Sequence, residues 1–147
     1  MTRRLIEDWL PIAALGEESV RERRSMTALP PTYYLHVWWA RRPLVASRAA
    51  IAASLLPATT DRDKFIHLIG IHGDPVATKK KIDRAKKTGE DLGLNPYGYE
   101  RAFKYLPTPE EQAWLKEESR EAGIEDATVL DPTAGGGSIP FESLRLG

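Results

Sequence analysis

The sequence predicts a mostly helical N-terminal region that leads into the first strand and helix of an α/β fold. Apolar residues recur at helical spacing up to about residue 122, and several of these segments carry clear helix starts and stops. Between residues 127 and 147 a short apolar run, a glycine-rich loop and a helical pattern follow one another, as in open α/β sheets. We therefore expect a helical N-terminal domain (1–57), a helical connector (58–126) and the start of an α/β domain (127–147).

The composition excludes several kinds of protein and site. The chain has no cysteine, and its three histidines lack the spacing of metal ligands, so we expect neither disulfides nor a bound metal. No run of 18 uncharged apolar residues occurs, and four of the first eight residues are charged, which argues against a membrane span or a signal peptide. We therefore expect a cytoplasmic protein without a membrane partner.

The N-terminal domain begins with two short predicted helices, one over residues 5–10 and one over 17–24. The prolines in 25–32 predict a loop, because they remove backbone donors and hold their neighbours extended. Pro43 suits the first position of a helix over 44–56, and this segment is apolar on nearly every face. We expect this third helix to be buried.

In the connector we expect surface helices over 61–71 and from Asp74 onward, with Gly89 as a stop. The second of these is rich in lysine and could touch DNA phosphates. A solvated helix face is the favoured interpretation, because no aromatic residues are interleaved for stacking on bases. A further helix should run from Thr108, which can cap it, to Ala122.

The C-terminal segment carries the pattern that points to a function. Thr128–Asp131 is an apolar run that ends in an acid, and three adjacent glycines precede a helical pattern over 139–146. Adjacent glycines let the backbone approach a ligand closely, and the following helix start offers free amide donors. The loop lacks the Gly-Lys-Ser/Thr of phosphate-binding NTPases, and its glycines are not spaced as in the dinucleotide fingerprint.

The segment DPTAGGGSIPFESLRLG resembles motif I of amino-group methyltransferases that act on DNA and RNA. That resemblance implies a Rossmann-like methyltransferase fold and S-adenosylmethionine as the cofactor, with the methionine portion held by the loop. The cofactor-binding residues expected in the loop are Asp131, Pro132, Ala134, Gly135, Gly136, Gly137 and Ser138.

Residues 5–57, and above all the stretch HVWWARRPL from His36, look like DUF1156, the uncharacterised N-terminal domain of adenine-specific DNA methylases found near phage-defence genes. By this resemblance the N-terminal segment completes the cofactor pocket. Arg41 and Arg42 would then stand at the positive end of the Pro43 helix, ready for the cofactor's carboxylate or a DNA phosphate. The alternative is that they pair with acids of the same fold. Trp39 could stack on an adenine ring, or could belong to the core.

The second methyltransferase motif, Asp or Asn followed by Pro-Pro and an aromatic residue, does not occur in the sequence, and Asn95-Pro96-Tyr97 reads better as a turn. We therefore expect an incomplete fold that needs the remainder of the methyltransferase domain or a partner chain, since one strand cannot form a sheet. The leading hypothesis is the S-adenosylmethionine-binding part of a DNA adenine-N6 methyltransferase, with DNA as partner and without activity alone. The rival is a helical DNA-binding or assembly module.

Overall fold

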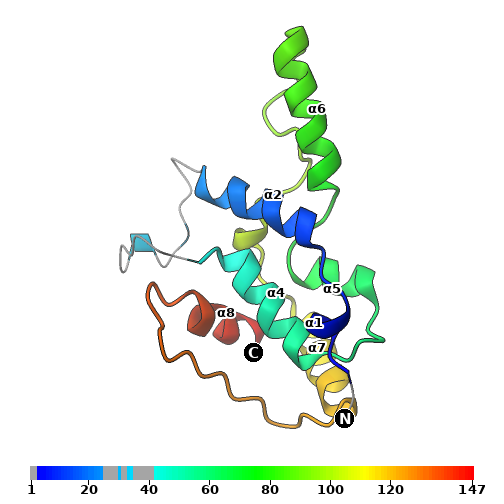
Figure 1. Ribbon diagram of the computed structural model, residues 1–147, viewed down its shortest axis with the longest axis vertical. Coiled ribbons are helices and arrows are strands. Elements are labelled where there is room, and N and C mark those ends of the chain that lie inside the picture. The colour runs from blue at the N-terminus through cyan, green and yellow to red at the C-terminus, as the bar shows by residue number, and fades with distance from the viewer. Residues whose placement is uncertain (1–2, 25–29, 31–32, 35–41) are drawn as a thin grey trace.

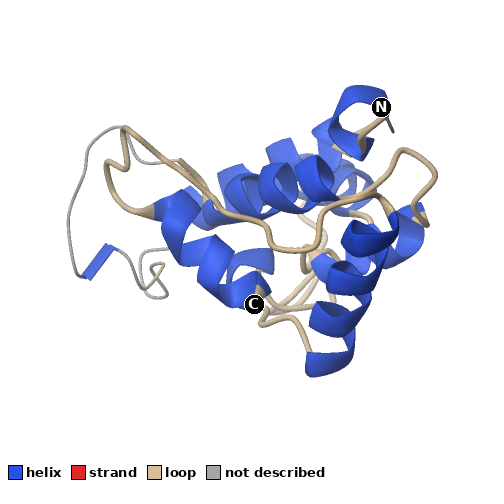
Figure 2. Cartoon of the chain, turned by 90° about the horizontal axis from the view of Figure 1, so that it is seen from below, coloured by secondary structure: helices blue, strands red, loops and turns tan. Residues whose placement is uncertain are grey.

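A computed structural model describes residues 3–24, 30, 33–34 and 42–147 of the chain as helices joined by loops (Figures 1 and 2). None of the helices in these ranges is long and apolar enough to cross a membrane. In chain order the elements are α1 (Leu5–Asp8), α2 (Ile12–Arg23), α4 (Leu44–Leu55), α5 (Arg62–Leu68), α6 (Pro75–Thr88), the 3-10 turn η1 (Ala102–Lys104), α7 (Pro109–Glu121) and α8 (Ser138–Leu146).

Helix α4 lies at the centre of this arrangement and packs against α1, α2 and α8. Five of its twelve residues are alanine, so neighbouring helices can approach its backbone closely. The expectation of a buried helix is confirmed, because most of α4 is inaccessible to water. Its buried residues are Leu44, Val45, Ser47, Arg48, Ala49, Ala52 and Ala53.

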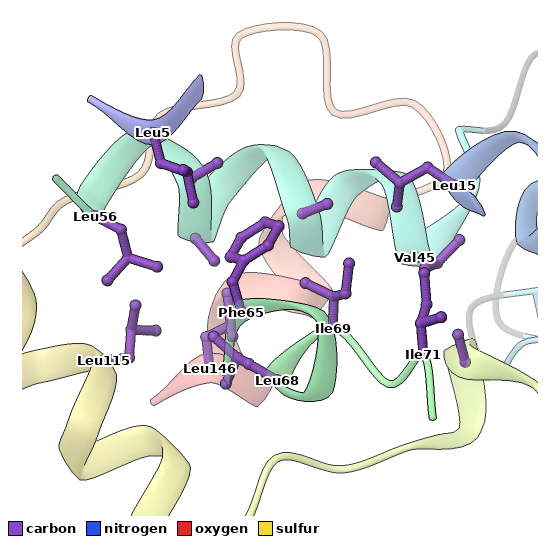
Figure 3. Close-up of a cluster of buried hydrophobic side chains, with 14 residues drawn as sticks. Leu5, Leu15, Val45, Leu56, Phe65, Leu68, Ile69, Ile71, Leu115 and Leu146 are labelled. Carbon is purple, nitrogen blue, oxygen red and sulfur yellow. The ribbon is translucent and has the colours of Figure 1, made fainter. Parts of the chain in front are cut away.

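One hydrophobic core joins α4 to the other helices. Phe65 and Leu68 of α5 are fully buried beneath α4, and Leu115 of α7 and Leu146 of α8 belong to the same cluster (Figure 3). Burial of such large apolar side chains is the main force that holds the helices together. Leu5 of α1 also enters this core, which ties the start of the described chain to its end.

The helices of the connector begin and end close to the predicted positions. The Asp74 side chain accepts a hydrogen bond from the Ala77 amide at 2.8 Å, and Gly89 ends α6 in the left-handed conformation with φ of 75°. Thr108 and Glu111 form the predicted capping box of α7. Local chemistry therefore decided these boundaries.

Two N-terminal boundaries differ from the prediction. Helix α1 ends at Asp8 rather than at residue 10, because Pro11 holds the residue before it out of the helical conformation. Helix α2 begins at Ile12, five residues earlier than predicted, and so includes Gly16. Burial of Leu15 and Glu18 against the body outweighs the weak helix propensity of that glycine.

The predicted strand Thr128–Asp131 is not formed. In the part of the chain that the structure describes there is no β-strand, and the single bridge joins Arg4 to Pro57 (Figure 2). Residues 127–130 are exposed loop, because no neighbouring strand offers hydrogen-bond partners to their backbone. The helical part of the predicted fold class is confirmed, whereas the α/β continuation stays a prediction.

Candidate functional site

The glycine loop is open and leads directly into α8. Gly135 and Gly137 have φ values of 55° and 74°, which favour glycine, and the Gly137 amide donates to the carbonyl of Ala134 at 2.8 Å. Residues 132–135 are exposed, and a methyl group added at Gly137 would meet no atom within 4 Å. The loop therefore leaves room for a ligand beside its backbone.

Asp131, at the start of this loop, has one carboxylate oxygen without a hydrogen bond. Its Oδ1 accepts from the Thr133 amide at 3.1 Å, whereas Oδ2 is buried and receives no hydrogen bond from the described residues. Among the described residues, Oδ2 pairs with the Nη1 of Arg42 at 3.9 Å. The Asp131 side chain is 5% exposed and that of Arg42 is 58% exposed. A buried carboxylate oxygen that has no hydrogen bond can accept one from a further donor.

The segment before α4 and the start of α8 meet at this point. The Ser138 hydroxyl donates to the carbonyl of Arg42 at 2.8 Å, across 96 residues of sequence. Arg42 thus joins Asp131 and Ser138, which flank the glycine loop far along the chain, in one cluster. The arrangement places a guanidinium, a carboxylate and a glycine-rich backbone side by side.

Helix α8 is fixed to α4 by buried charges. Glu142 accepts from the Nε of Arg48 at 2.5 Å and from Arg145 at 2.6 Å, and both Arg48 and Glu142 are fully buried. Arg145 also donates to the carbonyls of Phe103 and Tyr105. The position of α8, and with it the end of the glycine loop, is therefore set by the N-terminal region.

The N-terminus of α4 is already occupied by a carboxylate of the same chain. Glu22 of α2 is 3% exposed and accepts the Leu44 amide with both oxygens at 3.0 Å. Glu22 therefore stands at the end of the Pro43 helix where a cofactor carboxylate or a DNA phosphate is expected, and the role expected of Arg41 and Arg42 there stays a prediction. The internal carboxylate accepts the Leu44 and Val45 amides at this helix start, so we expect Arg42 to act on a ligand through its side chain.

Comparison with known proteins now places the chain. Residues 9–87 match a family described as protein of unknown function (DUF1156). The chain belongs to the DUF1156 family. No curated protein matches it, and no solved structure does.

The DUF1156 region spans α2, α4, α5 and α6, and the glycine loop lies beyond it. Within the DUF1156 region, Arg48 lies in the helix that α8 contacts, and Arg42 precedes that helix by two positions. The contacts of Arg42 and Arg48 therefore join the family region to the loop. The DUF1156 region thus contributes Arg42 to the candidate site.

The predicted site residues of this DUF1156 protein are only partly placed together. Arg42, Asp131 and Ser138 form the cluster described above, and the remaining loop residues, Pro132, Ala134, Gly135, Gly136 and Gly137, border it. Trp39 and Arg41 lie outside the described residues. Sequence reasoning missed Glu22, Arg48 and Glu142. The one signal for Arg48 was a charged residue in the middle of an otherwise apolar helix.

Two further features of the described chain bear on the chemistry. No group of three or more His, Asp or Glu side chains in the described ranges is placed to hold a metal ion.

A groove of about 910 Å³ runs between α4, α7 and α8, with Ile51, Leu115, Val129 and Leu144 among its lining residues. It lies on the apolar side of α8 and shares no lining residue with the cluster of Arg42, Asp131 and Ser138.

Proposed function

We propose that Asp131, Arg42 and the glycine loop bind the methionine part of S-adenosylmethionine. The observation that carries this proposal is the buried Oδ2 of Asp131, which lacks a hydrogen bond and lies 3.9 Å from the guanidinium of Arg42. An α-amino acid group carries one ammonium and one carboxylate. The carboxylate of Asp131 complements the first and Arg42 complements the second.

The loop supports this assignment in two ways. Its positive-φ glycines have no side chains that would crowd the backbone, so the methionine part of the ligand can approach closely. Residues 132–135 are exposed, so a small shift of these residues would open Oδ2 to an ammonium group. The Thr133 amide, which donates to Oδ1, belongs to the same segment and would move with it.

The reaction proposed for the whole enzyme is methylation of adenine N6 in DNA. The loop resembles motif I of amino-group methyltransferases that act on DNA and RNA, and residues 5–57 resemble the N-terminal domain of adenine-specific DNA methylases. When bound, the cofactor supplies the methyl group, and the residues of this chain hold and orient its amino acid portion. The Asp/Asn-Pro-Pro-aromatic motif that would hold the target amine does not occur among the 147 residues, so we propose a cofactor-binding role without turnover.

Calorimetry with three ligands tests the proposal. S-adenosylmethionine and S-adenosylhomocysteine should bind, and 5′-methylthioadenosine, which lacks the amino acid group, should bind at least tenfold more weakly. Asp131→Asn should weaken the first two by about tenfold, which corresponds to about 1.4 kcal/mol, and should leave the third unchanged. Arg42→Gln removes the group proposed to complement the carboxylate of the ligand. Its matched control is Arg62→Gln, since Arg62 is similarly exposed and also pairs with an acid. Equal binding of all three ligands, or of none, would contradict the proposal.

The rival function is a helical DNA-binding module without a cofactor. It is favoured by a separate observation, the lysine-rich helix α6, which holds six basic residues and one acid. DNA binding by a chain that binds none of the three ligands would support this second function. Arg42 is shared by the two hypotheses, because it could also hold a DNA phosphate, whereas Asp131 belongs to the first alone and α6 to the second alone.

A further inference from the structure

Helix α6 forms a basic arm at one end of the molecule. It extends away from the body along the long axis and contacts α2 near its lower end (Figure 1). Its fourteen residues span about 21 Å. Five basic side chains on it are exposed, and these are Lys80, Lys81, Arg84, Lys86 and Lys87.

These cations are not neutralised by the fold. Within the described ranges the only salt bridge on α6 joins Lys79 to Asp83, and the five exposed basic residues form none. Lys80, Arg84 and Lys87 are spaced at i, i+4 and i+7, so they form one stripe along the helix. A stripe of exposed, unpaired cations attracts a polyanion.

The charge of the molecule is segregated toward its two ends. The whole chain has a formal net charge of zero, yet α6 alone holds six basic residues and one acid. Helix α7, at the opposite end of the long axis in Figure 1, holds five acidic and two basic residues. A polyanion is therefore drawn to the arm and repelled from the other end.

The apolar side of α6 is used within the fold. Pro75 and Ala85 are buried, and Val76 and Ile82 are partly buried. A helix that lies in a membrane surface needs an exposed apolar face to insert. Only the charged face of α6 remains free, which favours a water-borne polyanion over an anionic bilayer.

The aromatic residues of the following loop are engaged elsewhere. The guanidinium carbon of Arg21 lies 3.9 Å from the ring centroid of Tyr97 and 4.8 Å from that of Tyr99. The Tyr99 hydroxyl donates to Glu18 at 2.8 Å. Single-strand binding surfaces stack bases on free aromatic faces, and these two rings are occupied by the chain itself. The arm is thus equipped for phosphates rather than for bases.

We infer that the exposed stripe of α6 binds the phosphate backbone of duplex DNA without reading its sequence. This inference deepens the proposed function, because it names the surface that holds the DNA of a DNA-modifying enzyme. It places the DNA contact in the DUF1156 region, which includes α6 up to residue 87. The contact adds affinity and orientation, and base recognition belongs to other residues.

Fluorescence anisotropy with two unrelated 20-base-pair duplexes tests the inference. The full chain is titrated at 50 to 200 mM salt, and the triple variant Lys80→Gln, Arg84→Gln, Lys87→Gln is compared with it. Loss of three phosphate contacts should reduce the slope of log affinity against log salt by roughly 2.7, equally for both duplexes. Glutamine keeps the helix propensity, and circular dichroism checks that α6 persists.

A matched control removes the same charges from the other side of the molecule. Lys64→Gln, Lys116→Gln, Arg120→Gln also replaces two lysines and one arginine at exposed positions of α5 and α7. It should leave the salt slope unchanged. An equal loss in both triple variants would overturn the inference, as would tighter binding of single-stranded DNA, an acidic peptide or anionic vesicles than of duplex. Asp131→Asn should leave DNA affinity intact, so a failure of cofactor binding is distinguishable from a failure of the arm.

Discussion

Arg48 and Glu142 carry opposite charges at a place where neither side chain reaches water. A buried ion pair of this kind contributes little net stability relative to apolar residues, but removal of one partner leaves an uncompensated charge in the core. Arg145 shares the same carboxylate and is itself mostly buried. The triad therefore fixes where α8 lies on α4, since another position of the helix would separate these charges.

Glu142→Gln should destabilise the protein by about 3 kcal/mol or more, because Arg48 would remain charged and buried without its partner. Chemical denaturation monitored by circular dichroism measures the loss. Glu117→Gln is the control, because Glu117 pairs with Arg120 on the surface and such pairs contribute less than about 1 kcal/mol. Similar losses for both variants would show that the triad does not hold α8.

Replacement by alanine should change the stability of the protein in opposite directions at Gly137 and at Gly16. Gly137 has a φ of 74° and no neighbour near an added methyl group, so Gly137→Ala should cost about 1 kcal/mol through backbone strain alone. Gly16 lies inside α2 with open space around it, so Gly16→Ala should stabilise by about 0.5 to 1 kcal/mol. Thermal unfolding measures both changes. Destabilisation by the second substitution would mean that α2 is not helical at that point.

Sequence reasoning at the residue scale found some of the site and missed the rest for a physical reason. Asp131 and the glycines could be predicted from the sequence, because they are neighbours along the chain and form a local turn. Arg48 and Glu142 lie 94 residues apart, and nothing local shows that they meet. Long-range charge pairing is decided by packing, which a single sequence does not display.

At the scale of elements, α7 shows how one side chain can serve both a helix start and a tertiary contact. Glu111 accepts from the Thr108 amide at 2.8 Å, from the Tyr105 hydroxyl at 2.6 Å, and pairs with the Nδ1 of His67 at 2.7 Å. Burial acts to raise the pKa of Glu111, but these hydrogen bonds together hold it below the usual 4.5. The stability of the start of α7 therefore depends on pH.

A depressed folded-state pKa means that Glu111 contributes stability above about pH 4.5 and that this contribution is lost as the pH falls through the lower folded value. Glu111→Gln should cost about 1 kcal/mol at pH 6, and its difference from the native protein should shrink as the pH is lowered to 3. Urea denaturation across this range measures the effect. Glu121→Gln, at the exposed end of the same helix, is the control. A difference that grows toward low pH would contradict the assignment.

The helices were predictable where local capping residues and glycines set their ends. Thr108, Asp74 and Gly89 set boundaries by hydrogen bonds or dihedral angles within a few residues, and the structure has them where the sequence indicated. The strand Thr128–Asp131 failed the same test. Its apolar pattern is typical of a strand, but strands exist only in pairs, and the described chain offers no neighbour to pair with it.

At the scale of the whole molecule, exposed apolar residues gather around the groove between α4, α7 and α8. Leu130 and Leu144 are 85% and 81% exposed, and Val129 and Leu144 line the groove. Exposed apolar residues beside a groove are typical of surfaces through which proteins associate. The opposite end of the molecule carries the basic arm, so the two surfaces can be altered separately.

Replacement of both exposed leucines should therefore change association without changing the fold. Leu130→Ser combined with Leu144→Ser should lower the fluorescence of a bound hydrophobic dye and the light scattering of concentrated protein, because two exposed apolar side chains are removed, Leu144 from the groove lining and Leu130 next to Val129 in the sequence. The free energy of unfolding should stay within about 0.5 kcal/mol of the native value, since neither side chain is buried. Leu94→Ser supplies the comparison, because Leu94 is fully exposed in the loop after α6 and lines a different pocket. If that single change lowered dye binding as much as the double variant, the groove would not be the associating surface.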